Sequence, residues 1–196
     1  MILLKETLRK SIHISSLLIP MAYRYVLGFD HRKQMFWLLL AAFVVSLVVE
    51  FYRFWQKDFR KTFFKVFGMV LRKHELRDFT GATYLLFSGM LCVAFFEPNI
   101  AFLGMSFLAL GDTFAAMVGI NWGKRKFRGC NKSLEGSLAC FTACFIFGLF
   151  YASHPLIAFT GAVAAALSEL SKLPVDDNVE MPLVSALVMT LTKVLI

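Results

Sequence analysis

Asp112 stands in a long apolar run of the sequence, flanked by Gly111 and Thr113. At the centre of a membrane helix an ionised carboxylate costs about 2.5 to 3.5 kcal/mol on insertion scales, so it faces a polar cavity or a cation. Carboxylate oxygens are also the ligands that Mg²⁺ takes from proteins, usually one or two of them beside phosphate oxygens and water. Asp112 is therefore the first residue that we expect to be functional.

A basic segment with several glycines, GKRKFRGCNKSLEG, follows at residues 123–136. Its cations suited to phosphate groups are Lys124, Arg125 and Lys132. A helix that begins after Ser133 would also offer free N–H groups to an anion. With Asp112 and Glu135 on Mg²⁺, such a set can perform phosphoryl or nucleotidyl transfer. Ser133 fits equally well as a plain N-cap, with Glu135 complementing the helix dipole.

Small residues recur at every fourth position through this part of the chain, at Gly111, Ala115, Gly119 and Gly123. The spacing places small side chains on one helix face and permits close approach of a neighbouring backbone. Helix packing is the favoured interpretation. Contact with a ligand is the alternative, and it makes Gly111, Gly123 and Gly136 candidate nucleotide contacts.

A second acidic group lies further along the chain, with Glu169 late in an Ala-rich run and then Asp176, Asp177 and Asn178. Clustered carboxylates and an amide are suited to metal, ribose or general-base roles. A solvated turn with Asx caps would use the same residue types. Because Glu169 is embedded in apolar sequence, we favour the functional interpretation.

Three further groups of ionisable residues stand near the ends of apolar runs: Arg9, Lys10 and His13; Glu50 and Arg53; Arg72 and Glu75. The pairs spaced three residues apart are expected to be salt bridges that neutralise each other at a membrane boundary. His13 is expected to be an interfacial polar residue rather than a catalytic one.

The composition requires a bilayer around these residues. Of the 196 residues, 58% are hydrophobic and 17% are charged, and a water-soluble domain of this size would need more polar surface. Apolar runs long enough to cross about 30 Å of hydrocarbon lie near residues 11–28, 34–55, 79–96, 100–121, 134–152, 155–173 and 180–196. We therefore predict an all-α, polytopic integral membrane protein with about seven transmembrane helices, forming a single domain over residues 1–196.

The distribution of Lys and Arg predicts the orientation, because basic residues are retained on the cytoplasmic side. Most of those outside the apolar runs fall in residues 1–10, 56–78 and 122–133. A cytoplasmic N-terminus and two cytoplasmic basic loops follow. The formal charge of +8 is then concentrated on one membrane face, where it would meet anionic head groups or nucleotide phosphates.

Residues 111–141, GDTFAAMVGINWGKRKFRGCNKSLEGSLACF, resemble the CTP-using lipid-alcohol kinases, a family that includes dolichol kinase, phytol kinase and the yeast-type diacylglycerol kinase. Supporting matches are RKSIHI at 9–14, the Glu50 to Arg53 pair, RKHELRDFTGATY at 72–84, and Glu169 followed by DDNVEMPL at 176–183. The resemblance spans nearly the whole chain.

This resemblance implies CTP as phosphoryl donor, Mg²⁺ as cofactor, a membrane lipid alcohol as acceptor and no nucleic-acid partner. The implied acceptors are a polyprenol, diacylglycerol or phytol, and the implied location is the plasma (inner) membrane. The implied metal ligands are Asp112, Glu135 and Glu169. The implied catalytic residues are Asp112, Lys132, Glu135 and Asp177. The residues implied to contact the nucleotide are Gly111, Gly123, Lys124, Arg125, Lys132, Ser133, Gly136, Asp176 and Asn178.

Two alternatives stay open. The central segment is also similar to that of phosphatidate cytidylyltransferases, but the chain has VDDNVEMP where those enzymes have a Pro-Gly-His-Gly-Gly stretch, and this favours a kinase. An ion-coupled transporter without enzymatic activity could also embed Asp112 and Glu169. The basic GKRK loop beside Asp112 argues against a transporter.

Overall fold

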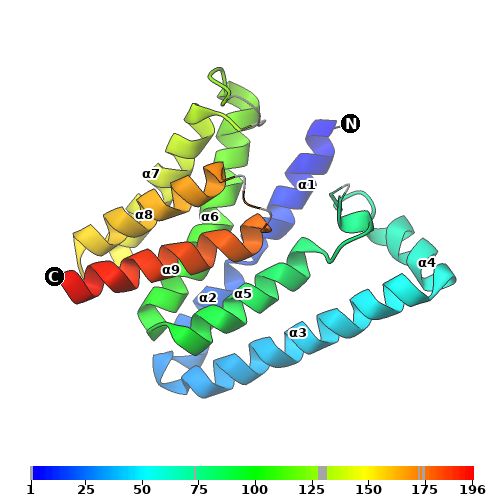
Figure 1. The fold of residues 1–196 in the computed structure, drawn as a ribbon, viewed down its shortest axis with the longest axis horizontal. Helices are drawn as coiled ribbons and strands as arrows, with labels where there is room; N and C mark the ends of the chain where they lie inside the picture. The colour runs from blue at the N-terminus through cyan, green and yellow to red at the C-terminus, as the bar shows by residue number, and fades with distance from the viewer. Residues whose placement is uncertain (1, 73, 128–131, 172, 174) are drawn as a thin grey trace.

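The computed structural model describes residues 2–72, 74–127, 132–171, 173 and 175–196. This part of the chain is almost entirely helical, which confirms the all-α prediction (Figure 1). The helices are α1 (Ile2–Ser15), α2 (Leu18–Ala22), α3 (Arg32–Trp55), α4 (Lys57–Phe67), α5 (Gly81–Phe95), α6 (Pro98–Trp122), α7 (Leu134–Tyr151), α8 (Pro155–Leu170) and α9 (Asp177–Leu195). Short π and 3-10 turns occupy Tyr23–Leu27, Phe29–His31 and His74–Leu76.

Several of these helices can cross a membrane. Within the described residues, four helical segments are long and apolar enough, namely Phe29–Trp55, which contains α3, together with α6, α7 and α9. The shorter apolar helices α5 and α8 lie at two more of the predicted spans. The chain is therefore a multi-pass, all-α membrane protein, whereas the count of about seven spans stays a prediction.

The first predicted span, at 11–28, is broken into short pieces. α1 ends at Ser15, α2 is a short helix and the π turn ends at Leu27. Pro20 within α2 has no N–H to donate and disfavours a regular helix through the preceding turn. Gly28 has φ +81°, a conformation that glycine adopts without strain, and it lets the chain turn towards α3.

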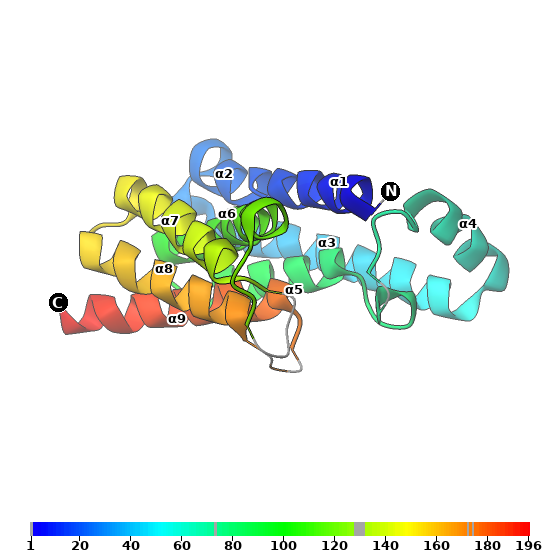
Figure 2. The same ribbon diagram turned by 90° about the horizontal axis from the view of Figure 1, so that it is seen from above.

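α6 is the central helix of the bundle, with α7, α8 and α9 on one side and α1 and α5 on the other (Figures 1 and 2). Its residues 100–109 are buried without interruption. α3 packs on α5 at the edge of the bundle. The apolar core thus surrounds α6, and polar groups on this helix can be reached from several elements.

Small residues bring α6 and α7 together. A Cβ added to Gly136 would lie 2.7 Å from the carbonyl oxygen of Ala115, and one added to Gly111 would lie 2.8 Å from Cys140 Sγ. A Cβ on Gly123 would lie 2.6 Å from the Ser133 hydroxyl oxygen. The packing interpretation of the small-residue ladder is confirmed here, while nucleotide contact by these glycines stays a prediction.

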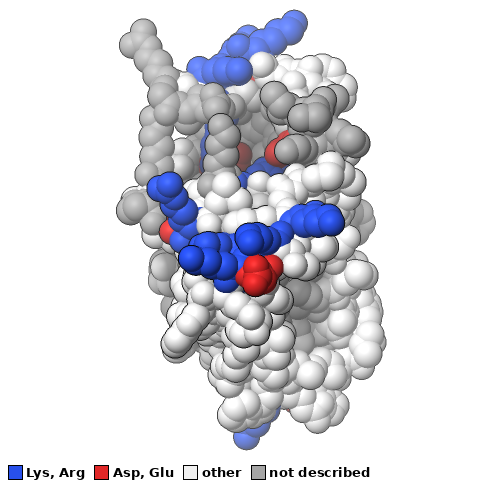
Figure 3. Space-filling model, turned by 90° about the vertical axis from the view of Figure 1, so that its right-hand side faces the viewer, with Lys and Arg blue, Asp and Glu red and all other residues white. Residues whose placement is uncertain are grey.

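α4 follows the C-terminal end of α3 and carries a row of exposed cations. Figure 3 views the molecule from this side and shows a band of Lys and Arg side chains. The exposed cations of α4 are Lys57, Arg60, Lys61 and Lys65. Phenylalanine rings occupy its other face, with Phe63 and Phe67 in contact at 4.9 Å between centroids. This pattern is typical of a helix that lies in a membrane interface.

A buried ion pair at the end of α3 holds the loop between α4 and α5. Arg53 Nη2 lies 2.5 Å from Glu50 Oε2, and both side chains are almost completely buried, which confirms this predicted salt bridge. Arg53 also donates to the carbonyl oxygens of Glu75 and Asp78 at 2.7 and 2.6 Å. Glu50 Oε1 accepts from the backbone N–H of Thr80 at 2.8 Å. The loop is therefore anchored to α3.

The predicted salt bridge between the Arg72 and Glu75 side chains is wrong. Glu75 is buried, and its carboxylate instead accepts from the backbone N–H groups of Arg72 at 2.5 Å and Gly81 at 2.8 Å. The Arg72 side chain is left free to extend elsewhere. Glu75 thus acts as a brace inside the loop, because a carboxylate satisfies backbone donors that face the protein interior.

Replacing Arg53 with Met is expected to destabilise the protein by about 3–5 kcal/mol, because Glu50 would be left as an unpaired buried charge. Lys61→Met is the matched control, since Lys61 forms an ion pair of the same spacing with Asp58 at 3.3 Å on the exposed surface. Thermal unfolding in detergent measures the loss of stability in each of the two variants. Equal shifts in the two variants would show that the buried pair does not anchor the loop.

Candidate active site

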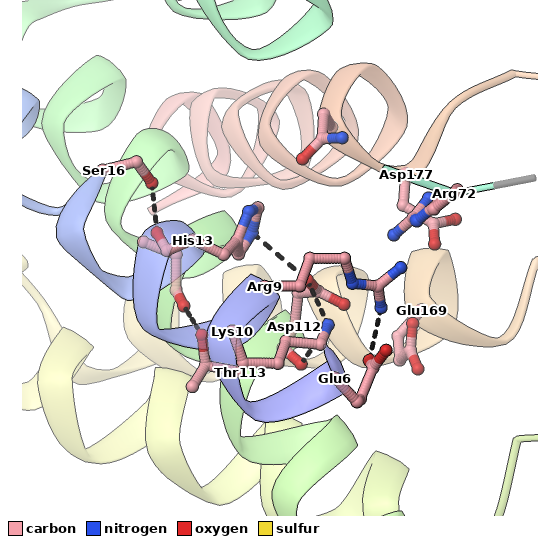
Figure 4. Close-up of polar contacts among 12 residues, drawn as sticks. Glu6, Arg9, Lys10, His13, Ser16, Arg72, Asp112, Thr113, Glu169 and Asp177 are labelled. Carbon is pink, nitrogen blue, oxygen red and sulfur yellow. Dashed lines mark hydrogen bonds and ion pairs between the residues drawn. The ribbon is translucent and has the colours of Figure 1, made fainter. Parts of the chain in front are cut away.

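Asp112 lies on the buried face of α6 and binds two residues of α1 (Figure 4). Lys10 Nζ is 2.5 Å from Asp112 Oδ2 and donates to the Asp112 carbonyl oxygen at 3.1 Å. His13 Nε2 is 3.2 Å from the same Oδ2, at ion-pair distance but outside hydrogen-bond geometry. The expectation that Asp112 faces a cation is confirmed.

The positions of Lys10 and His13 explain why both reach Asp112. Residues three apart on a helix share one face, so both side chains point from α1 towards α6. The Lys10 side chain is only 6% exposed and that of His13 14% exposed. His13 therefore lies inside the protein against the central carboxylate, and its expected position at the membrane interface stays a prediction.

Lys132 forms a second charged contact, between α8 and α9. Its Nζ donates to Glu169 Oε2 at 3.0 Å and to the Glu169 carbonyl oxygen, and it lies 3.6 Å from Asp177 Oδ2. Burial alone would lower the pKa of Lys132, but the carboxylates of Glu169 and Asp177 outweigh this effect and raise the pKa. Lys132 is thus held as a cation between two acidic residues.

Arg72 and His74 bring the anchored loop to the start of α9. Arg72 Nη1 and His74 Nε2 each lie 3.8 Å from Asp176 Oδ2. The other oxygen of Asp176 accepts from the backbone N–H of Asn178 at 3.0 Å and from its side-chain amide at 2.6 Å. Asp176 therefore caps α9, as the Asx-cap alternative proposed, and it also faces two basic side chains.

Arg72 connects the two charged groups electrostatically. Burial alone would lower its pKa, but the carboxylates of Asp112, Asp176 and Asp177 together raise it above the ordinary value. In Figure 4 Arg72 and Asp177 lie beside each other, with Glu169 and Asp112 nearby. One polar cluster therefore draws its residues from α1, the loop before α5, α6, the segment before α7, and the facing ends of α8 and α9. We call it the Asp112 cluster, and its members are Lys10, His13, Arg72, Asp112, Lys132, Glu169, Asp176 and Asp177.

Other predicted site residues lie in the loop between α6 and α7 and in the first turn of α7. Glu135 is in the first turn of α7, and its carboxylate accepts from the backbone N–H of Arg125 at 3.2 and 3.3 Å. Lys124 and Arg125 are exposed in the same loop. Ser133 caps α7 by accepting from the backbone N–H of Gly136 at 3.1 Å, which confirms the N-cap alternative. Roles of these residues towards metal or nucleotide stay predictions.

The cluster suits Mg²⁺ held together with a nucleotide better than a metal site made by protein alone. Among the described residues, no group of three His, Cys, Asp or Glu side chains is arranged to hold a metal ion. Mg²⁺ normally takes only one or two carboxylates and completes its shell with phosphate oxygens and water. Asp112 and Glu169 offer such oxygens, each now neutralised by a lysine.

The chain is similar to curated proteins along most of its length. It is 28% identical to the CTP-dependent diacylglycerol kinase 1 of Saccharomyces cerevisiae over 94% of the chain and 72% of that protein. It is 27% identical to the protein of the same name in Schizosaccharomyces pombe over 80% of each. It is 34% identical to the phytol kinase of a Synechocystis strain over 54% of the chain and 51% of that protein.

No family model and no solved structure matches the chain. The relatives nevertheless agree with the motifs at 111–141 and 72–84 in pointing to a membrane-embedded enzyme. They identify the chain as a homologue of the CTP-dependent lipid-alcohol kinases.

Proposed function

We propose that the protein transfers the γ-phosphoryl group of CTP to the hydroxyl of a membrane lipid. The observation that carries this proposal is the convergence of Lys10, Arg72 and Lys132 on the carboxylates around Asp112, inside a bundle of apolar helices. Phosphoryl transfer needs little covalent chemistry from a protein and depends on positioning and neutralisation of charge. The cluster supplies both, in a protein whose relatives carry the name of CTP-dependent diacylglycerol kinase.

The reaction forms a bond between the lipid hydroxyl oxygen and the γ-phosphorus. It breaks the bond between that phosphorus and the oxygen bridging it to the β-phosphate, so CDP leaves and the hydroxyl proton is released. Mg²⁺, when bound, neutralises charge on the β- and γ-phosphate oxygens. Arg72 and Lys132 would bind these oxygens, and Asp112 and Glu169 are the carboxylates that would hold the metal.

Two lysines neutralise these carboxylates, and this has a consequence for binding. Nucleotide with Mg²⁺ would bring both negative and positive charge, so each lysine could exchange its carboxylate for a phosphate, and Asp112 and Glu169 would then be available as metal ligands. Such an exchange avoids leaving a buried charge unpaired, which would be costly in an apolar bundle.

A transfer assay with detergent-purified protein and Mg²⁺ tests the proposal. CTP labelled in the γ or the α position is offered with a panel of polyprenol, phytol, diacylglycerol and phosphatidate. We expect label from the γ position in a lipid alcohol. Label from the α position in phosphatidate would instead define a cytidylyltransferase, and no transfer to any lipid would overturn the proposal.

We also propose that the N-terminus and the loops at 56–78 and 122–133 face the cytoplasm from the plasma membrane, because they hold most of the basic residues. Lys126→Cys and Glu97→Cys, introduced one at a time in a Cys130→Ser background that keeps the buried Cys92, Cys140 and Cys144, test this orientation. Both positions are exposed and lie beyond opposite ends of α6. An impermeant thiol reagent added to intact cells should label only the Glu97→Cys protein, and the reverse pattern would contradict the orientation.

A further inference from the structure

A groove of about 320 Å³ runs between α1 and α6 on the outside of the bundle. Its apolar lining comes from Ile14 on α1 and from Phe114, Met117 and Ile120 on α6. The three α6 side chains are between 42% and 53% exposed although they belong to the central helix. This face of α6 is therefore open to the surrounding bilayer.

Three of the polar side chains in the groove wall donate to carbonyl oxygens of their own helices. Ser11 donates its hydroxyl to the Thr7 carbonyl oxygen at 3.0 Å, and Thr113 donates to the Ala109 carbonyl oxygen at 2.7 Å. The Asn121 side-chain amide donates to a carbonyl one turn earlier at 2.8 Å. Because these donors are already used, the wall can face hydrocarbon without the cost of an unpaired polar group.

Lys10 joins the groove to the Asp112 cluster. It lines the groove, and its ammonium group binds Asp112 at 2.5 Å. The candidate phosphate ligands Arg72 and Lys132 reach the cluster from other elements, the loop before α5 and the segment before α7. Asp112 therefore binds a lysine that lines the groove, and it belongs to the same cluster as Arg72 and Lys132, the cations suited to a nucleotide.

We propose that the groove between α1 and α6 binds the hydrocarbon chain of the acceptor lipid and delivers its hydroxyl to Asp112. This inference rests on the proposed kinase activity and names the path of its acceptor. Attacking and leaving oxygens lie roughly in line through the transferred phosphorus, so acceptor and nucleotide must approach from different sides. The groove provides the approach for the acceptor, and the part of the cluster that carries Arg72 and Lys132 provides the approach for the nucleotide.

The occupant is a single hydrocarbon chain rather than a head group or a protein helix. The groove has apolar walls, a volume at the lower end of ligand pockets, and an open side at the level of membrane-facing residues. Glu6 and Asn121 line it towards the cytoplasmic ends of α1 and α6. A lipid can therefore enter sideways from the bilayer while its hydroxyl meets Lys10 and Asp112.

Ala116→Trp tests the proposal, because Ala116 lines the groove and an indole there would fill it. Ala42→Trp is the matched control, since Ala42 is exposed on α3 away from the groove. We expect Ala116→Trp to raise KM for a long-chain acceptor about tenfold or more, equivalent to about 1.4 kcal/mol of lost binding, with KM for CTP unchanged. Ala42→Trp should leave both constants unchanged.

A second measurement needs no turnover. A diacylglycerol with a diazirine in one acyl chain is photolysed with the full-length protein in the absence of nucleotide, and the labelled peptides are identified by mass spectrometry. Labelling should concentrate on α1 and on residues 113–121, persist in Ala42→Trp and fall in Ala116→Trp. Labelling that is concentrated on other helices, or is the same in both variants, would overturn the inference.

The two measurements separate the inference from the function on which it rests. Labelling of the groove in a protein that transfers no γ-phosphoryl group would retain a lipid site and reject the kinase proposal. Normal transfer by Ala116→Trp, with unchanged KM for the lipid, would retain the kinase and reject the groove as the acceptor path.

Discussion

Asp112→Asn is expected to lower kcat by about 10²- to 10³-fold or more while the bundle stays folded. The substitution keeps the size of the side chain and an oxygen that can accept from Lys10, but it removes the negative charge at the centre of the cluster. In the proposed mechanism that charge holds Mg²⁺, and it balances the surrounding cations. Steady-state transfer to the best lipid alcohol measures the loss.

Two further variants make the Asp112 result interpretable. Asp58→Asn removes an exposed carboxylate on α4 and should leave turnover unchanged. Asp112→Glu keeps the charge and should retain more activity than Asp112→Asn. Near-normal turnover by Asp112→Asn, with an unchanged requirement for Mg²⁺, would show that the metal is held elsewhere.

Lys132→Gln is expected to raise KM for CTP and to lower kcat, with a combined loss in kcat/KM of about 10²- to 10³-fold. The cation is held by Glu169 and Asp177 at the place where we expect the phosphates to bind. Without it, two neighbouring carboxylates would repel the nucleotide. Transfer rates over a range of CTP concentrations measure both constants.

Lys126→Gln is the control for this effect, because Lys126 is an exposed cation of the same loop. It should change kcat/KM little. Lys132→Arg should recover part of the activity, since it restores the charge with a different geometry. If Lys126→Gln and Lys132→Gln lost activity equally, the loop would act only through its overall charge.

Much of the fold could be predicted from the sequence. The length and apolar character of six runs located α3 and α5 to α9, because a membrane span needs a fixed length of apolar helix. The breaks within the first predicted span, at 11–28, were not predicted, since a short π turn and a glycine with positive φ leave little trace in hydropathy. In this segment the backbone conformation of a few residues, rather than the apolar composition, determines where the helices end.

The candidate site was predictable only in part. The cost of burying a charge predicted that Asp112 meets a cation, but not which one, because Lys10 is 102 positions away in the chain. The spacing of Arg72 and Glu75 suggested a local ion pair, yet Glu75 satisfies backbone donors and Arg72 turns to Asp176. Long-range partners of this kind follow from helix packing rather than from spacing.

The most direct test of the central claim is to follow the products of one reaction by ³¹P nuclear magnetic resonance, with purified protein, CTP, Mg²⁺ and the acceptor lipid. The account predicts that CDP and a lipid monophosphate accumulate in equal amounts, and that both signals are lost in Asp112→Asn. Pyrophosphate and a lipid joined to CMP, or equal amounts of CDP and free phosphate without phosphorylated lipid, would contradict it.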